Sequence, residues 1–352
     1  METITTTQYV HDPQAPISSF DLDDTLIRTR SGKKFPEDED DWRMWSLDMT
    51  LEVLQAVPPE RKIVIFTNKK RWNPITKGVC TGFMQFLQDN NIPAILYASI
   101  KEGWTRKPQI GMLQDHTHQQ PVAPGSTYCG DAAGRIGDFS SSDRAFAHNA
   151  GMEFLLPEQV FLPLAQIERY QLGIQAIHAT LKWTKCVVDD VSYETQDELP
   201  QPLYGEREMV VLMGYPGAGK STVARSLSQA GYITVEYGQT GMMALIRVAL
   251  KSSTFGIIID GTHSSRKNRE KSLKLAKKAN IRTRIIHINT PPDLAKINAA
   301  RRVHEKKLAG IHIPNVAYNV YSKHFEEPLA DEADIIQTYR PPIVPTGMVF
   351  SI

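Results

Sequence analysis

The stretch that most restricts how this chain can fold begins with an apolar run at residues 209–213. It continues into residues 214–221, Gly-Tyr-Pro-Gly-Ala-Gly-Lys-Ser. These residues match the pattern Gly-x-x-x-x-Gly-Lys-Ser, between a predicted buried strand and a helix predicted over residues 222–230. The glycines let backbone N–H groups surround phosphate oxygens, Lys220 adds positive charge, and the Ser221 hydroxyl can hold magnesium. Strand, loop and helix in this order predict a parallel α/β sheet with an anion site at the helix start.

Two more buried strands are predicted in this half of the chain, at residues 232–236 and 256–260. The second ends in Asp260, whose carboxylate suits a magnesium shell because magnesium prefers oxygen ligands. A glycine turn with an incidental lysine is the alternative, but it does not explain the strand, the helix and the acidic strand end together. The predicted nucleotide-binding residues are Gly214, Gly217, Gly219, Lys220, Ser221, Thr222 and Asp260.

A pair of carboxylates follows the first predicted strand of the N-terminal half. Asp21 and Asp23 lie two residues apart, and side chains two apart on a strand point the same way. Neighbouring carboxylates repel each other, so the arrangement requires a cation or an incoming phosphate between them. One could attack phosphorus while the other handles the proton. An acidic turn after a short strand is the alternative for an isolated Asp-x-Asp.

Three further pieces follow in an order that argues against an isolated turn. A predicted buried strand at residues 62–68 carries Thr67 near its end, a basic turn contains Lys107, and a predicted strand at residues 126–131 ends in Asp131. Alternating strands and helices bring such residues to the carboxyl edge of a parallel sheet, where doubly wound folds bind ligands. The predicted fold class is α/β in two domains, with a doubly wound parallel sheet in the first half and a parallel sheet of the kind that carries a phosphate-binding loop in the second.

At roughly 150 residues per domain, a chain of 352 residues predicts two domains. We expect a flexible lead-in at residues 1–17, a first domain at 18–163, a connecting segment at 164–207 and a second domain at 208–352. The formal net charge of +1 neither requires nor excludes nucleic acid, so any such site must be a local basic patch. Three scattered cysteines, no signal segment and no apolar run of ~20 residues predict an intracellular soluble protein.

The ordered motifs of the N-terminal half resemble those of the haloacid-dehalogenase phosphatase superfamily. They are Asp21-Leu22-Asp23-x-Thr25, Phe66-Thr67-Asn68, Arg106-Lys107-Pro108 and Gly130-Asp131. More narrowly, residues 130–135 and 138–147 are similar to the polynucleotide kinase 3′-phosphatases. That family's kinase half is matched by residues 214–222, Ile259-Asp260-x-Thr262 and His312-Ile313-Pro314.

The resemblance implies an enzyme that heals nucleic-acid ends, removing 3′-phosphates and phosphorylating 5′-hydroxyls with magnesium and ATP. By the family's roles, Asp21 attacks the phosphate and forms an aspartyl-phosphate. Asp23 protonates the leaving oxygen and then activates water, while Thr67 and Lys107 hold the phosphoryl oxygens. The magnesium ligands expected from the resemblance and the motifs are Asp21, Asp23, Asp131 and, in the kinase half, Ser221.

The kinase half departs from the family pattern at one position. The family carries an Arg-Asp pair just after its second strand, and this Asp acts as base on the 5′-hydroxyl. Here Tyr237 and Gly238 stand in that place, and the nearest carboxylate is Glu236. Glu236 can substitute for the base if the strand extends to residue 238, because residues two apart on a strand share a face. Two alternatives are that the domain only binds nucleotide, or that the family pattern aligns one or two residues away.

Arg301 is the candidate lid arginine of the kinase, since a cation in the helix after Pro291-Pro292 can stabilise developing phosphate charge. The predicted function is DNA end repair by a 3′-phosphatase joined to a 5′-kinase. The alternatives are a 3′-phosphatase whose weak or inactive kinase half is an end-binding scaffold, an RNA end-healing enzyme, and a metabolite phosphatase fused to a small-molecule kinase. We expect a monomer that acts away from membranes on DNA with 3′-phosphate and 5′-hydroxyl ends. A ligase and other repair proteins are the expected partners, in the nucleus by family resemblance, with the cytoplasm as the alternative.

Overall fold

The computed structural model describes residues 1–46, 49–162, 181–189, 197–203, 206–252, 256–307, 313–342 and 345–351. The chain divides into two compact units, each considered by itself. Unit 1 comprises Met1–Asp189, Ala300–His312 and Gly347–Ile352, and unit 2 comprises Asp190–Ala299 and Ile313–Thr346. Most of the expected connecting segment lies outside the described residues. None of the described helices is both long and apolar enough to cross a membrane.

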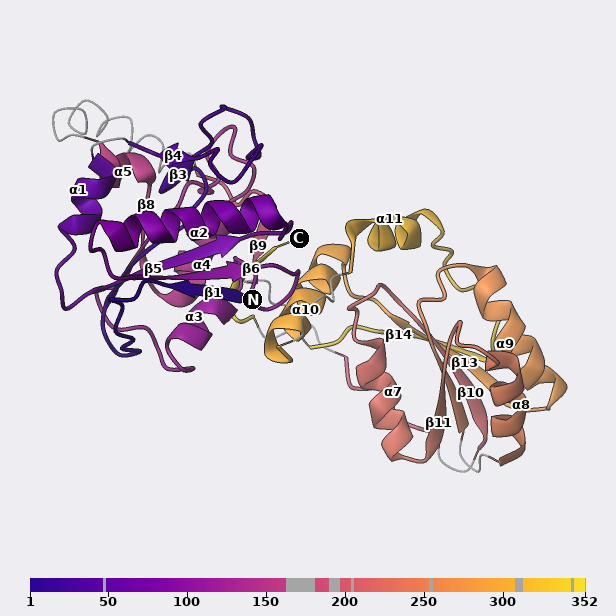
Figure 1. The fold of residues 1–352 in the computed structure, drawn as a ribbon. Coiled ribbons are helices and arrows are strands. Elements are labelled where there is room, and N and C mark those ends of the chain that lie inside the picture. The colour runs from indigo at the N-terminus through magenta and orange to yellow at the C-terminus, as the bar shows by residue number, and fades with distance from the viewer. Residues whose placement is uncertain are drawn as a thin grey trace. The chain divides into compact units, whose positions relative to one another are not determined.

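Unit 1 is built on a six-stranded sheet with helices on both faces (Figure 1). The strand order is β1-β6-β5-β2-β7-β8, and all neighbours are parallel except β1 and β6. The strands are β1 (Glu2–Thr5), β2 (Ile17–Phe20), β5 (Lys62–Asn68), β6 (Ala94–Ser99), β7 (Thr127–Cys129) and β8 (Glu153–Leu155). The helices are α1 (Met49–Gln55), α2 (Pro74–Asp89), α3 (Gly111–His116), α4 (Ser142–Ala150) and α5 (Pro157–Phe161). Two small antiparallel sheets pair β3 (Ile27–Arg28) with β4 (Arg43–Met44) and β9 (Cys186–Val188) with β15 (Val349–Ser351).

The central strand β5 explains why helices cover both faces of this sheet. Ile63 and Ile65 belong to the core cluster that includes α2, whereas Val64 and Phe66 belong to the cluster that includes α3 and α4. Successive side chains of a strand point to opposite faces, so β5 is apolar on both sides. Such a strand must be covered twice, which is typical of parallel sheets in α/β proteins.

Two expected boundaries are wrong. The lead-in at residues 1–17 is not a loose segment, because β1 pairs antiparallel with β6 at the sheet edge. The second domain, expected over residues 208–352, loses residues 300–312 and 347–352 to unit 1. The errors at residues 1–17 and 347–352 have one physical origin. Strands β1 and β15 are short, and their partners are distant in the sequence, so no local hydrophobic pattern indicates the pairing.

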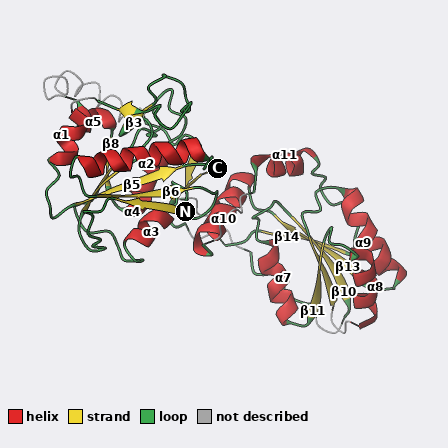
Figure 2. Cartoon of the chain, in the orientation of Figure 1, coloured by secondary structure: helices red, strands yellow, loops and turns green. Residues whose placement is uncertain are grey.

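Unit 2 is built on a five-stranded parallel sheet of order β11-β12-β10-β13-β14, also covered on both faces (Figure 2). Its strands are β10 (Glu208–Met213), β11 (Tyr232–Glu236), β12 (Gly256–Asp260), β13 (Arg282–Ile288) and β14 (Ile335–Tyr339). The helices of this part of the chain are α7 (Lys220–Gln229), α8 (Met242–Ser252), α9 (Arg266–Lys278), α10 (Pro292–Glu305) and α11 (Asn315–Lys323). Alternate residues of β10 belong to two core clusters, one with α8 and α9 and the other with α7.

Each sheet contains a point at which successive connections leave a strand on opposite sides. In unit 1 this strand is β2, which lies between β5 and β7, and in unit 2 it is β10, which lies between β12 and β13. Diverging loops open a crevice beyond the carboxyl end of such a strand, and α/β proteins bind ligands there. The predicted α/β fold class with parallel sheets is confirmed, and it directs attention to residues that follow β2 and β10.

Candidate active sites at the carboxyl ends of the two sheets

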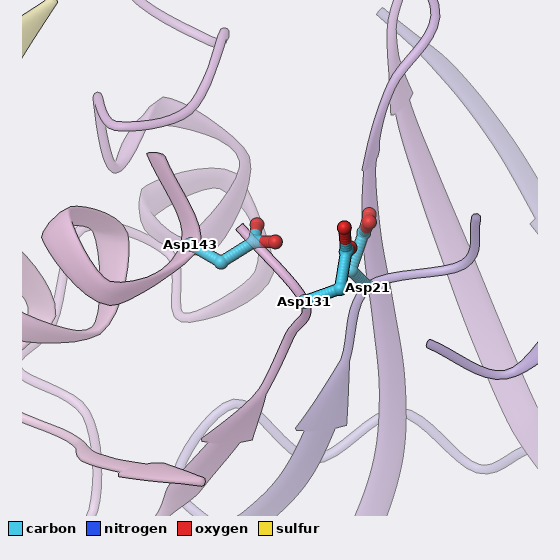
Figure 3. A group of neighbouring side chains, drawn as sticks. All are labelled: Asp21, Asp131 and Asp143. Atoms are coloured by element: carbon cyan, nitrogen blue, oxygen red, sulfur yellow. The ribbon is translucent and has the colours of Figure 1, made fainter. Parts of the chain in front are cut away.

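Three carboxylates converge at the carboxyl edge of the unit 1 sheet. Asp21 follows β2, Asp131 lies just beyond β7, and Asp143 is in the first turn of α4. One oxygen from each lies within 4.8 Å of the others, and Figure 3 shows the three side chains. The sequence predicts Asp21 and Asp131 at this edge, but not Asp143. Its only signal is its place in the motif at residues 138–147, because a residue at a helix start is not marked by strand periodicity.

Lys107 forms hydrogen bonds to two of the three carboxylates of this cluster. Its Nζ donates to Asp21 Oδ1, to Asp143 Oδ1 and to the Tyr128 hydroxyl, each at 2.7 Å. The Asn68 side chain holds the Lys107 backbone from both sides, accepting from its N–H at 3.0 Å and donating to its carbonyl at 3.1 Å. Burial disfavours the ammonium charge, but Asp143 and Asp21 outweigh burial, so the pKa of Lys107 is raised. This lysine is therefore a fixed positive charge beside Asp21.

The carboxylates of the cluster are hard to ionise together. Burial is the main cause that raises the pKa of Asp21 to about 7; Lys107 opposes it, and Asp143 and Asp23 add to it. Burial, followed by Asp143 and Asp21, raises the pKa of Asp131 to about 9. One lysine cannot balance three neighbouring carboxylates, of which Asp21 and Asp143 are buried and Asp131 is half-buried. Hard divalent cations prefer such an oxygen set, so the donor chemistry fits magnesium at Asp21, Asp131 and Asp143.

Asp23 does not join this group, contrary to the expected magnesium ligand set. Strand β2 ends at Phe20, and Asp24 adopts a left-handed backbone with φ 54°, so Asp21 and Asp23 are not on one strand face. The Asp23 carboxylate instead accepts two hydrogen bonds from Lys69 Nζ, at 2.6 and 2.7 Å. Half of its side chain is exposed, which leaves it accessible to an incoming group.

Thr67, the predicted ligand of the phosphoryl oxygens, lies at the carboxyl end of β5. It is the penultimate residue of β5 and is fully buried. Its hydroxyl has no hydrogen-bond partner among the described residues. A buried hydroxyl without a partner costs free energy unless a bound group satisfies it. This side chain is therefore suited to a ligand oxygen at the carboxyl edge of β5.

Two exposed phenylalanines and three cations near their rings form a group in unit 1 that we call the aromatic rim. We use the name for Lys34, Phe35, Arg71, Phe139 and Lys185. Phe35 and Phe139 are 59% and 70% exposed as whole residues. Lys34 Nζ lies 5.8 Å from the first ring and 5.0 Å from the second, Arg71 lies 5.4 Å from the first, and Lys185 lies 3.3 Å from the second. These residues lie in or beside loops, where sequence periodicity gives no signal, and sequence reasoning missed them.

The glycine-rich loop of unit 2 requires its glycines. Gly214, Gly217 and Gly219 have φ angles of 150°, 80° and 105°, where other residues are strained. A Cβ on Gly217 would lie 2.1 Å from the carbonyl oxygen of Ala295. Lys220 starts α7, and its Nζ donates to the carbonyls of Gly214 and Tyr215 at 2.9 and 2.6 Å. The lysine thus lies folded over the loop whose N–H groups and helix start suit phosphate.

The predicted magnesium residues of unit 2 meet in the structure. The Ser221 hydroxyl in the first turn of α7 donates to Asp260 Oδ2 at the end of β12, at 3.1 Å. Thr222 follows in the same exposed turn. A hydroxyl and a carboxylate beside a phosphate-binding loop are the protein ligands that magnesium uses in loops of this kind. The side chains present therefore fit a magnesium–nucleotide complex.

Glu236 is the last residue of β11 and lies opposite Asp260 in the parallel register. The strand does not extend to Gly238, which has φ 84° and lies exposed in a turn. The condition that Glu236 and residue 238 share a strand face is therefore not met. Arg301, in α10, forms an ion pair with the buried carboxylate of Asp189 within unit 1.

The chain matches two family models, one described as polynucleotide kinase 3 phosphatase over residues 16–161 and one as an AAA domain over residues 236–328. A bifunctional polynucleotide phosphatase/kinase of Schizosaccharomyces pombe is 29% identical over 89% of this chain and 76% of its own length. A putative bifunctional polynucleotide phosphatase/kinase of Acanthamoeba polyphaga mimivirus is 27% identical over 92% of this chain and 83% of its own. A polynucleotide 3′-phosphatase of Saccharomyces cerevisiae is 27% identical over 41% of this chain, covering 87% of that protein. The chain therefore resembles the bifunctional polynucleotide phosphatase/kinases over most of its length, with the match to polynucleotide kinase 3 phosphatase in its first half and the match to an AAA domain in its second.

Proposed function

We propose that this protein heals broken polynucleotide ends by removing 3′-phosphates in unit 1 and phosphorylating 5′-hydroxyls in unit 2. The observation that carries the proposal is the pair of sites in one chain: Asp21 beside Lys107 at one sheet edge, and Ser221 beside Asp260 at the other. The relatives that align with most of this chain are named for both activities.

In the phosphatase reaction, Asp21 is the nucleophile. Its oxygen attacks phosphorus, the bond from phosphorus to the 3′-oxygen breaks, and Asp23 gives that oxygen a proton. Water then attacks the aspartyl-phosphate, Asp23 takes its proton, and inorganic phosphate leaves Asp21. Lys107 and the unpartnered Thr67 hydroxyl hold the phosphoryl oxygens, as their positions at the edge allow.

Magnesium at Asp21, Asp131 and Asp143 would neutralise charge on the phosphoryl group. This ligand set replaces the expected one in that Asp143 takes the place of Asp23. Lys69 then has a separate task, which is to hold the Asp23 carboxylate in one orientation. Each catalytic carboxylate then has its own lysine: Lys107 contacts the nucleophile Asp21, and Lys69 contacts the proton-transfer residue Asp23.

The aromatic rim supports a polymer substrate over a small metabolite. Exposed rings flanked by cations bind single-stranded nucleic acid, since bases stack on the rings and phosphates meet the cations. The net charge of the chain is only +1, so a local patch of this kind is what a nucleic-acid site requires here. We propose DNA as the main substrate, and RNA as the alternative.

In unit 2, Lys220 would bind the nucleotide phosphates, and Ser221 with Asp260 would hold magnesium. We assign Glu236 as the base on the 5′-hydroxyl and expect a weak kinase, because no carboxylate stands at Gly238. Arg301 would act as the lid arginine only after leaving Asp189. A nucleotide-binding scaffold is the second candidate, and the missing carboxylate favours it. A downstream ligase and a nuclear location complete the proposal by family resemblance.

The test is to measure both activities on DNA and RNA oligonucleotides with 3′-phosphate or 5′-hydroxyl ends, with ATP and magnesium. Replacing Phe35 and Phe139 together by Ala should raise KM by at least about 30-fold for an oligonucleotide, because base stacking contributes ~1–3 kcal/mol per base and two rings are removed. The same change should leave an aryl phosphate unaffected. Ile136→Ala is the matched control, since Ile136 is 98% exposed in the loop that carries Phe139. Equal rates on metabolite phosphates and oligonucleotides would refute a polymer-specific enzyme.

A further inference from the structure

The C-terminal strand β15 lies in unit 1, beside the phosphatase site. It pairs antiparallel with β9, so that Val349 lies opposite Val188. Val349 and Phe350 are fully buried, and Val349 belongs to a small core cluster with Ala145 of α4 and Cys186 of β9. Residues at the far end of the sequence, beyond the whole kinase half, therefore complete the structure around α4.

Asn149 connects this strand to the loop that carries Lys107. Its Oδ1 accepts from the Val349 N–H at 2.6 Å, and its Nδ2 donates to the Val349 carbonyl at 2.7 Å. The same Nδ2 donates to the Pro108 carbonyl at 2.9 Å. Two of these three hydrogen bonds fix the amide against β15. The third hydrogen bond lets the oriented amide hold the carbonyl of Pro108, the residue after Lys107.

Three residues hold Lys107 and the residue after it through hydrogen bonds. Asn68 holds its backbone N–H and carbonyl, and Asp143 accepts from its Nζ. Asn149 holds the next carbonyl, and it lies on α4, the helix that also carries Asp143. Helix α4 therefore fixes the positions of both the Lys107 ammonium and the turn that follows Lys107 in the chain. Strand β15 packs against this helix.

We propose that β15 is a positioning element of the phosphatase site, which acts through Asn149 to hold the turn at Lys107 and Pro108. The inference rests on the proposed phosphatase function. Without β15, the Asn149 amide loses two of its three hydrogen bonds and becomes free to rotate. The Pro108 carbonyl then loses a fixed donor, and Lys107 loses part of the support that holds its ammonium near Asp21.

The kinetic test uses the full-length chain, a variant ending at Thr346, Asn149→Ala, and both changes together. Both single changes should lower kcat on a 3′-phosphate oligonucleotide by about 10- to 100-fold, since a misplacement of about 1 Å at a catalytic group can cost 10²-fold. Inhibition by inorganic phosphate should weaken in parallel. The double variant should be no worse than the shortened chain, because both changes break one connection. ATP binding in unit 2 is the internal control and should not change.

The second measurement, hydrogen exchange, does not depend on activity. Three backbone amides around the turn are hydrogen-bonded in the structure: Lys107 donates to Asn68, Gln109 to Arg106 and Gly111 to Trp104. These amides should exchange faster in both single variants, while amides of the glycine-rich loop should not change. Wild-type exchange at this turn in a folded Asn149→Ala variant, with wild-type kcat and phosphate inhibition, would overturn the inference. An inactive wild-type enzyme would instead refute the proposed function, and the exchange data would still decide the role of β15.

Discussion

Magnesium binding at the carboxylate cluster should release protons, so its affinity should rise with pH. Burial raises the pKa of Asp21 to about 7 and that of Asp131 to about 9. A cation binds the ionised carboxylate, so any proton held by these groups must leave when magnesium enters. The raised pKa values place this competition in the neutral range, whereas ordinary carboxylates would be fully ionised there.

The size of the effect follows from the number of protons displaced. Below about pH 7 both Asp21 and Asp131 hold protons, so the apparent dissociation constant should fall by up to about 100-fold per pH unit. Between about pH 7 and about pH 9 only Asp131 holds one, and the fall should be about tenfold per unit. Above about pH 9 the affinity should level off.

Calorimetric titration with magnesium at about pH 6, 7 and 8 measures this directly. Repeating each titration in buffers of different ionisation enthalpy gives the number of protons released. Asp131→Asn is the control, since it removes the group with the higher pKa and should reduce proton release by one near neutral pH. An affinity that stays constant over this range, with heats independent of the buffer, would refute the electrostatic account of the cluster.

The remaining predictions concern single side chains. Asp21→Asn should abolish 3′-dephosphorylation and leave ATP binding intact, while Lys220→Ala should do the reverse; assays of both activities on each variant check this. Lys69→Met should slow hydrolysis of a 3′-phosphate by up to about 100-fold but affect an aryl phosphate less, because a good leaving group needs little proton transfer. The control is Lys70→Met, which changes an exposed neighbouring lysine and should leave the rates on both substrates unchanged. If Lys69→Met slowed hydrolysis of both substrates equally, the role of Lys69 would be purely structural. Glu236→Gln should remove any transfer of labelled phosphate from ATP to a 5′-hydroxyl oligonucleotide; an unaffected kinase would show that the base lies elsewhere.

Much of the central architecture could be predicted because buried parallel strands leave a clear local pattern. Strands β11 and β12 have the predicted bounds, and β5 and β10 appear as apolar runs with polar residues at or beyond their ends. The glycine-rich loop is equally local, since its strand, turn and helix are contiguous. Ser221 and Asp260 could be predicted as magnesium residues for this reason, and the structure brings them within hydrogen-bond distance.

The unpredicted parts depend on contacts between distant segments. Asp143 reaches the carboxylate cluster from a helix, and apart from its place in the motif at residues 138–147 it looks like an ordinary acidic residue in a first helical turn. The shared-face argument for Asp21 and Asp23 failed because β2 ends at Phe20, before either carboxylate. Strand β15 has three residues, and its position depends on β9 and Asn149. Such features follow from packing, which no short window of sequence contains.

The two sites use the same sheet geometry but differ in where their side chains come from. In unit 1 the strand ends supply Asp21, and groups outside the sheet, Lys107 and Asp143, complete the cluster. In unit 2 the strand ends and the loop supply nearly all of the candidate side chains. When the carboxylate that the family carries after β11 is missing, few other side chains can therefore take its place. Because β11 ends at Glu236, residue 238 lies in an exposed turn rather than on the strand face. Glu236 is opposite Asp260 in register, and this places it at the sheet edge that carries the phosphate-binding loop. If unit 2 transfers phosphate, we propose that Glu236 takes the proton, because it is the carboxylate nearest to residue 238 in the sequence.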